Sequence, residues 1–252
     1  MATFGVEYVD EFSNVRAAGV ISGGGQDLSC PYYIGRWFGG TLKDAGHTWK
    51  EFHVNLGVAE HDMRDVPSGG NDRADSVDLW FIITHGNYAN GQLSLLFDTK
   101  KEDFFGRSKD WHFGDTCNLE WLWIYGCHSI NGDNILEHLG IFKGLHLICG
   151  SYGDMYDSWT IDEVGEDTAN NLLCGHPVSE SWLDGVSDWW VSNHPMVISV
   201  ETKDTFNDGD PDYSTTVIGS DHLWGEGVVR ADIPPNKQFW MQAFYDDGGI
   251  YG

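Results

Sequence analysis

Positive charge is scarce in this chain of 252 residues. It has 14 Lys and Arg residues against 39 Asp and Glu, which gives a formal net charge of −25 at pH 7. A field of this sign repels the phosphate backbone of nucleic acids, so nucleic-acid binding is the first function to be excluded. Cationic substrates or divalent cations are compatible with the charge, although a solvated acidic surface without a specific partner is the simpler interpretation.

Long apolar runs and paired cysteines are lacking as well. No segment approaches the ~18 consecutive apolar residues of a membrane helix, so no membrane partner is expected. The opening "MATFGVEYVDEF" has neither a basic region nor an apolar core of the secretory type, which predicts a cytoplasmic protein. The five cysteines are odd in number and form no CxxC pair, which favours free thiols in a reducing compartment.

The remaining pattern predicts an α/β fold. Hydrophobic residues make up 41% of the chain, enough for a buried core. Short apolar runs that read as buried strands lie at 4–9, 49–57, 77–84, 119–126, 144–150 and 196–201. Helical patterns lie at 132–142, 166–175 and 178–190. Alternating strands and helices, with several strands apolar on both faces, indicate a mostly parallel central sheet with helices on both faces.

Domain organisation follows from the same pass along the chain. Residues 1–202 carry the strand and helix signals of one α/β domain. Residues 203–252 are rich in turn-forming residues and poor in helix signal. We expect them to form an irregular or β-rich C-terminal extension that packs on the same domain.

Residues with chemical potential follow two of the apolar runs. "VDLWFIIT" 77–84 ends at His85-Gly86, and "LEWLWIYG" 119–126 ends at Cys127-His128. If these strands are parallel neighbours, both ends lie at the sheet edge where α/β proteins bind ligands. An imidazole can activate a thiol near neutral pH, so His85 and Cys127 are a candidate base and nucleophile. The N–H groups of Gly86 and Cys127 could then hold an oxyanion.

This pattern resembles the caspase-like, or clan CD, cysteine peptidases, which include caspases, metacaspases, legumains, gingipains, separases and CHAT-domain proteases. Their signature is an apolar strand followed by His-Gly and a second apolar strand followed by a residue and Cys. Here it reads "LWFIITHG" 79–86 and "LWIYGC" 122–127, and His85 lies 42 residues before Cys127. The downstream "LHLICGSYG" 145–153 and "LLCGHPVSESWLDG" 172–185 are similar to the CHAT branch.

The resemblance also implies where a substrate side chain would bind. In these peptidases the P1 pocket lies beside the nucleophile and under the loop that follows the next strand. Here that loop is "GSYGDMYDSW" 150–159, which contains Asp154, Asp157 and Trp159. Acidic residues at this place would favour Arg or Lys at P1. His128 would support the substrate or the loop.

Metal sites are the competing interpretation of the same residue types. A zinc site from His112, Cys117, Cys127 and His128 would have spacings that match no closed structural pattern. The acidic stretch 204–214 offers Asp208, Asp210 and Asp212 as Ca²⁺ ligands. It lacks the glycine and the final acid of an EF-hand loop, so a solvated acidic loop is the simpler interpretation and no cofactor is otherwise expected.

The sequence therefore predicts a cysteine hydrolase, most simply a peptidase, with a His85/Cys127 dyad. Taken singly, a histidine or cysteine at a strand end is more often structural, so two alternatives stay open. In one, the caspase-like scaffold binds a small hydrophobic or aromatic molecule in a Trp-rich pocket and catalyses a cyclisation or isomerisation. In the other, the chain is a non-catalytic interaction domain. The partner is accordingly a peptide, a protein or a small hydrophobic substrate, and the oligomeric state is open.

Overall fold

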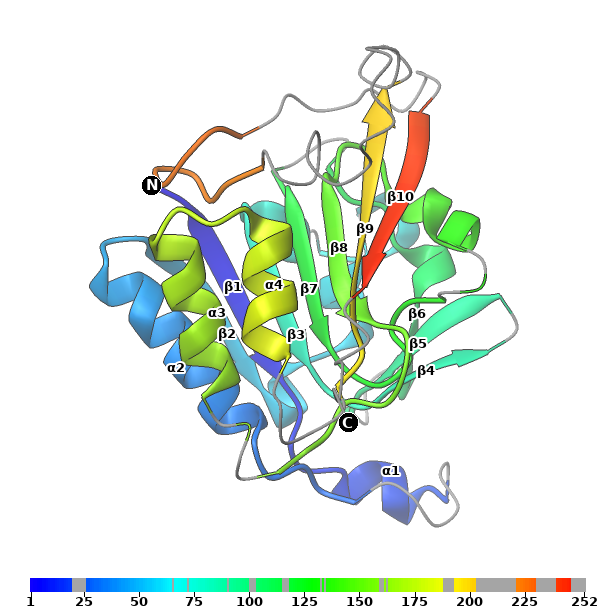
Figure 1. Ribbon diagram of the computed structural model, residues 1–252. Helices are drawn as coiled ribbons and strands as arrows, with labels where there is room; N and C mark the ends of the chain where they lie inside the picture. The colour runs from blue at the N-terminus through cyan, green and yellow to red at the C-terminus, as the bar shows by residue number, and fades with distance from the viewer. Residues whose placement is uncertain are drawn as a thin grey trace, which may run out of the picture.

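A seven-stranded mixed sheet forms the centre of the computed structural model (Figure 1). The structure describes residues 1–19, 26–64, 66–71, 73–89, 91–99, 103–114, 118–131, 133, 135–158, 161, 163–187, 193–202, 221–229 and 239–245. The sheet order is β10-β9-β8-β7-β3-β1-β2. The five strands from β8 to β2 are parallel, and β9 and β10 are antiparallel to their neighbours. The expected α/β fold with a mostly parallel sheet is confirmed.

The elements have the following bounds. The strands of the large sheet are β1 (Thr3–Tyr8), β2 (Thr48–Val54), β3 (Leu79–Ile83), β7 (Trp121–Tyr125), β8 (Leu147–Ser151), β9 (Pro195–Thr202) and β10 (Phe239–Tyr245). A small antiparallel sheet contains β4 (Gly86–Ala89), β5 (Gln92–Leu96) and β6 (Phe105–Arg107). The α-helices are α1 (Ser13–Ala17), α2 (Pro31–Asp44), α3 (Val164–Leu173) and α4 (Val178–Val186). Short 3-10 helices lie at Asn55–Gly57, Glu60–Met63, Val66–Ser68, Ala74–Ser76, Ser108–Asp110 and Ile135–Ile141.

Two hydrophobic cores lie on opposite faces of the large sheet. In β3, Phe81 packs in the core beneath α2 and α4, whereas Trp80 and Ile82 pack in the second core. In β7, Trp123 and Leu122 divide between the two cores in the same way. Both strands are buried at every position, because alternate side chains point to opposite faces and both faces are covered.

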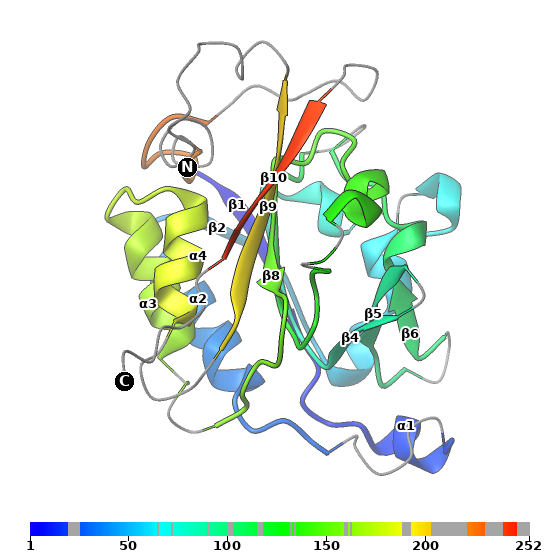
Figure 2. The same ribbon diagram turned by 45° about the vertical axis from the view of Figure 1, so that its right-hand side comes forward.

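The two faces are covered differently from the sequence prediction. Figure 2 shows α2, α3 and α4 together on one face, with the small sheet β4–β6 on the other. In the described chain, this small sheet, several 3-10 helices and the short α1, whose Val15 lies in the second core, cover the second face. The expected α-helix at 132–142 is a 3-10 helix, Ile135–Ile141. Its Gly140 has low helix propensity, and His138 accepts a hydrogen bond from Asn131 N at 2.9 Å.

Helix α2 has no strong sequence signal, because it contains three glycines. Two of them are packing positions. A Cβ at Gly35 would lie 3.1 Å from Val6 of β1, and a Cβ at Gly39 would lie 2.6 Å from the Trp49 ring of β2. These glycines let α2 lie close to the sheet. The first turn of α2 then borders the carboxyl ends of β1 and β3, where the candidate site lies.

At the other end of the chain, β10 pairs antiparallel with β9 over seven residue pairs, from Phe239↔Thr202 to Tyr245↔Met196. The C-terminal region therefore contributes an edge strand to the large sheet. No helix in the described part of the chain is long and apolar enough to cross a membrane.

Candidate functional site

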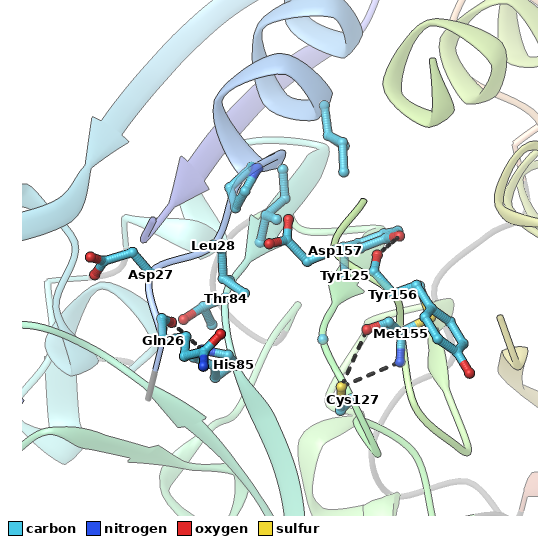
Figure 3. A pocket seen from close by; sticks show the side chains of 14 residues that line it. Gln26, Asp27, Leu28, Thr84, His85, Tyr125, Cys127, Met155, Tyr156 and Asp157 are labelled. Atoms are coloured by element: carbon cyan, nitrogen blue, oxygen red, sulfur yellow. Dashed lines mark hydrogen bonds between the residues drawn. The ribbon is translucent and has the colours of Figure 1, made fainter. Parts of the chain in front are cut away.

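A pocket of about 320 Å³ lies at the carboxyl ends of β3 and β7. Its lining combines strand ends, the first turn of α2 and two loops: Gln26, Asp27, Leu28, Pro31, Ile34, Ile83, Thr84, His85, Tyr125, Gly126, Cys127, Met155, Tyr156 and Asp157. Both His85 and Cys127 line it, and Figure 3 shows them on opposite sides of the space. The edge of the sheet that the sequence indicates thus carries a cavity.

The register of two parallel strands sets the positions of His85 and Cys127. Ile83 of β3 pairs with Tyr125 of β7, and His85 and Cys127 each lie two residues beyond that pair. Thr84 N donates to Tyr125 O at 3.2 Å and extends the pairing toward the pocket. The two side chains are therefore delivered at the same level of the sheet.

Two glycines allow the strand ends to approach closely. A Cβ at Gly86 would lie against the carbonyl oxygen of Cys127, far inside van der Waals contact. A Cβ at Gly126 would lie 2.7 Å from Thr84 O. The close approach of the strands thus explains why glycine occupies both positions, Gly86 and Gly126, because a side chain at either one would push the strands apart.

The imidazole of His85 is held by backbone from a distant part of the chain. Its Nε2 lies 3.0 Å from the carbonyl oxygen of Gln26, and its ring centroid lies 4.8 Å from that of Phe12. A carbonyl oxygen only accepts hydrogen bonds, so Nε2 must carry a proton. In the neutral ring Nδ1 then has the free lone pair, and within the described residues no group bonds it.

The thiol of Cys127 is partly buried and bonds the loop after β8. Its Sγ lies 3.5 Å from Met155 O and 3.3 Å from Met155 N (Figure 3). Burial raises the pKa of the thiol and the nearby Asp154 carboxylate adds to this, while the Met155 N–H lowers it. At neutral pH the resting group is a thiol. Among the described residues it has no hydrogen bond to His85.

Two backbone donors lie beside the thiol, the N–H groups of Cys127 and Gly86. The Cys127 N–H makes no backbone hydrogen bond within the described residues, whereas the next residue donates to Gly153 O at 2.7 Å. The Gly86 N–H makes none outside the pairing of β4 with β5. Both donors lie at the closely packed strand ends.

Comparison with known families bears on this geometry. The model of one family, described as a domain of unknown function (DUF6345), matches residues 17–244. The chain belongs to the DUF6345 family. No curated protein matches it. The DUF6345 match spans every lining residue of the pocket, from Gln26 to Asp157.

The two acidic residues expected to bind substrate have different positions in this DUF6345 domain. Asp157 lines the pocket, and its carboxylate accepts hydrogen bonds from Ser29 N at 2.6 Å and Cys30 N at 2.8 Å. Asp154 is 74% exposed, does not line the pocket and pairs with His128 at 3.1 Å. One predicted residue is therefore at the pocket and the other is outside it.

Three further sequence predictions concern residues around the site. His128 is exposed and does not line the pocket, and its φ of 48° lies in the left-handed region. Trp159 lies outside the described residues, as do Cys117 and the Ca²⁺ candidates Asp208, Asp210 and Asp212. Among the described residues, no group of three or more His, Cys, Asp or Glu side chains is arranged to hold a metal ion.

No tryptophan is among the described lining residues of this pocket. Trp121, Trp123 and Trp182 are fully buried in the core beneath α2–α4. The aromatic residues of the described lining are Tyr125 and Tyr156, and the Tyr125 hydroxyl donates to Tyr156 O at 2.9 Å. Trp121 and Trp123 of β7 belong to the core because alternate strand residues point to opposite faces of the sheet and this face is covered by helices.

Sequence reasoning missed the segment Gln26–Leu28, which forms one wall of the pocket. This segment is fastened by Asp27, which accepts a hydrogen bond from Phe12 N at 2.9 Å and pairs with Arg16 at 2.8 Å. The hydrogen bond from Arg16 and that from Phe12 lower the pKa of Asp27. The segment has no periodic pattern, so its position depends on contacts that sequence alone does not reveal.

Proposed function

We propose that this protein is a cysteine hydrolase, most simply a peptidase, in which Cys127 is the nucleophile and His85 the general base. The observation that carries the proposal is the register of β3 and β7, which brings both residues to one pocket at the same level. Ligands of open parallel sheets bind at this edge. The likeness of "LWFIITHG" and "LWIYGC" to the caspase-like signature supports it, and membership of that superfamily is part of the proposal.

The chemistry follows from the tautomer of His85. With its Nε2–H bonded to Gln26 O, the ring has Nδ1 as its proton acceptor. When substrate enters, Cys127 leaves Met155 and its thiol proton passes to Nδ1. The sulfur bonds the acyl carbon, the proton passes to the leaving amine, and the carbon–nitrogen bond breaks. Water then attacks the thioester and restores the thiol and the neutral ring.

Oxyanion stabilisation would come from the N–H groups of Gly86 and Cys127. Neither makes a backbone hydrogen bond in the described part of the chain apart from strand pairing. Donors fixed in the backbone stabilise developing charge without having to reorganise during the reaction. The packed glycines at the strand ends keep these donors in place.

A preference for Arg or Lys at P1 is retained, on a different basis. The described lining contains the carboxylates of Asp27 and Asp157 and no Lys or Arg. A carboxylate side chain of a substrate would be repelled there, and a cation attracted. Asp157 therefore replaces Asp154 as the residue that favours a basic substrate, because the charge of Asp27 is already paired with Arg16.

The second candidate function is binding of a small apolar or aromatic molecule without hydrolysis. Leu28, Pro31, Ile34, Ile83 and Met155 give the pocket an apolar part. The Cys127 thiol is held by Met155 and its pKa is raised, which disfavours a resting thiolate. A non-catalytic interaction domain is the remaining alternative.

Labelling with a peptidyl acyloxymethyl ketone that has Lys at P1 tests the hydrolase. We expect Cys127 to be labelled, and labelling to disappear in Cys127→Ala and to slow at least about tenfold in His85→Ala, as for loss of a general base. Cys174→Ala is the matched control, because Cys174 is an exposed thiol away from the pocket. Equal labelling of wild type and Cys127→Ala would overturn the proposal.

Cleavage assays with different substrates then test the preference for a basic residue at P1. Fluorogenic peptides with Arg at P1 should be cleaved faster than peptides with Asp at P1. Faster cleavage of Asp-P1 peptides contradicts the basic preference and leaves the nucleophile unchanged. If Cys127 is inert, thermal shifts with small aromatic compounds separate the ligand-binding function from the interaction domain.

A further inference from the structure

An exposed aromatic surface lies beside the pocket but faces away from it. Tyr32, Tyr33 and Trp37 of α2 and Phe52 of β2 are 46%, 46%, 38% and 37% exposed. Pro31 and Ile34, in the same turn of α2, line the pocket. Aromatic side chains of this size are normally buried, so a group of exposed ones needs a reason.

The rings form one continuous surface. The centroids of Tyr32 and Tyr33 are 5.2 Å apart, and those of Tyr33 and Trp37 are 6.4 Å apart. The buried Tyr8 joins the two elements, with its ring 6.2 Å from Tyr32 and 5.9 Å from Phe52. We call Tyr32, Tyr33, Arg36, Trp37 and Phe52 the aromatic face.

A cation lies within this face. The guanidinium carbon of Arg36 is 6.0 Å from the Tyr32 ring centroid and 5.6 Å from that of Phe52. Arg36 is exposed and makes no ion pair with any described residue, so its N–H donors remain available to a carboxylate. Helix α2 contains two basic residues, Arg36 and Lys43, and one acidic residue, Asp44, at its last position. Arg36 is the one charged residue of the aromatic face, on a chain with a net charge of −25.

The adjacent strand β2 is at the end of the sheet. It pairs with β1, and no other described strand pairs with it. The side chains of Phe52 and Val54 on this strand are each 37% exposed. An edge strand with free backbone groups can accept an added strand from another polypeptide. In Figure 1, α2 and β2 lie on the same side of the molecule.

We propose that the aromatic face and the outer edge of β2 bind an extended acidic segment of another polypeptide. Its backbone pairs with β2, its aromatic or aliphatic side chains pack on Tyr32, Tyr33, Trp37 and Phe52, and one of its carboxylates bonds Arg36. Tyr, Trp and Arg dominate the energetics of protein interfaces, and all three occur here together. The proposal does not depend on hydrolysis, because the surface lies outside the pocket.

Panning of a phage-displayed library of random peptides, each longer than β2, tests this surface. We compare wild type with the double variant Arg36→Glu/Trp37→Ser, and use Lys109→Glu/Trp224→Ser as the matched control. Lys109 and Trp224 are exposed outside the face. Circular dichroism and thermal unfolding check that the variants remain folded. We expect wild type and control to enrich peptides that combine acidic and aromatic residues, and the double variant not to enrich them.

An enriched peptide then gives the binding mode by fluorescence anisotropy. Arg36→Glu should weaken binding at least about tenfold, the size of one charge-assisted hydrogen bond. A peptide N-methylated at alternate residues keeps its side chains but cannot pair as a strand, and it should bind much more weakly. The proposal is overturned by equal enrichment on the double variant, by enrichment of basic peptides, or by full binding of every N-methylated peptide. A concentration-dependent dimer that the double variant abolishes, without peptide enrichment, would assign the surface to a second copy and also overturn it.

Discussion

The carboxylate of Asp157 accepts a hydrogen bond from the N–H of Cys30 at 2.8 Å, although the two residues are 127 positions apart in the sequence. The same carboxylate accepts a second hydrogen bond, from the N–H of Ser29 at 2.6 Å. Asp157 belongs to the loop that contains Met155, which bonds Cys127, whereas Cys30 immediately precedes α2. The wall of the pocket that holds the thiol is thus tied to the start of α2. A carboxylate at this position also complements the positive end of the helix.

Substitution of Asp157 should therefore loosen the fold as well as the pocket. Asp157→Ala leaves two backbone donors without their acceptor, and we expect a loss of about 1–3 kcal/mol in the free energy of unfolding. Asp157→Asn should lose less, because the amide oxygen still accepts. Urea denaturation measures both. Asp154→Asn, three residues earlier and exposed, should change stability by less than about 0.5 kcal/mol. Equal effects at the two positions would contradict the role of Asp157.

The burial of Glu7 leads us to expect that the free energy of unfolding decreases as pH rises. It is fully buried, and the Asp62 side chain lies beside its carboxyl group. Burial, with the Asp62 charge adding to it, raises the pKa of Glu7 well above 4.5. Between that ordinary value and the raised value, the folded state keeps a proton that the unfolded chain releases, so stability falls as pH rises through this window.

Glu7→Gln should remove this decline, because the amide stays neutral. The difference in unfolding free energy between Glu7→Gln and wild type should grow in favour of the variant as pH rises, by at most about 1.4 kcal/mol per pH unit. Urea denaturation from pH 4.5 to 9 measures it. The exposed Glu11 gives the control variant Glu11→Gln, for which we expect the curve to run parallel to wild type. Parallel curves for Glu7→Gln would show that Glu7 is charged throughout.

The ion pairs of His146 lead us to expect a second loss of stability, at alkaline pH. Burial lowers the pKa of His146, but the hydrogen bonds and charges of Asp221 and Glu120, each 3.0 Å from a ring nitrogen, outweigh it and raise the pKa to about 9. The stabilisation is fully present below about pH 6.5, the ordinary value, and is lost as pH rises through about 9. Asp221→Asn should cost about 3 kcal/mol at pH 6, as for breaking a buried ion pair, and clearly less at pH 10. Unfolding curves at both pH values check this, with the exposed Asp133→Asn as control. A loss of equal size at both pH values would mean that the ring is neutral.

Six strands of the large sheet, all except β10, and the two strand-end residues could be predicted from the sequence. Runs such as "LWFII" in β3 and "WLWIY" in β7 are apolar at every position because both sheet faces are covered, and this signal is local. His85 and Cys127 follow these runs directly, so the parallel pairing alone brings them together. Helix α2 could not be found this way, because Gly35 and Gly39 are explained by contacts with Val6 and Trp49 and not by helix propensity.

The walls of the pocket were also beyond sequence reasoning. Gln26 and Asp27 reach the site through bonds to His85 and Phe12, which are close in space and, for His85, far in sequence. The loop after β8 contacts Cys127 through Met155, but which of its acids faces the pocket depends on its backbone. Asp157 points to the start of α2, whereas Asp154 points to His128. Alternation or spacing cannot determine that choice.

Gly86 provides a direct test of the closely packed strand ends. A methyl group in Gly86→Ala would lie against the Cys127 carbonyl oxygen, so β4 and the end of β7 must move apart. We expect a loss of about 1–3 kcal/mol in unfolding free energy, as for overpacking a buried site, and slower labelling of Cys127 by the acyloxymethyl ketone. Gly140→Ala is the matched control, because a Cβ there meets nothing within 4 Å. Its stability should equal that of wild type or exceed it slightly, since alanine favours helix more than glycine does. If Gly86→Ala is as stable as wild type and Cys127 reacts at the same rate, the close approach of the two strand ends is not required for the site.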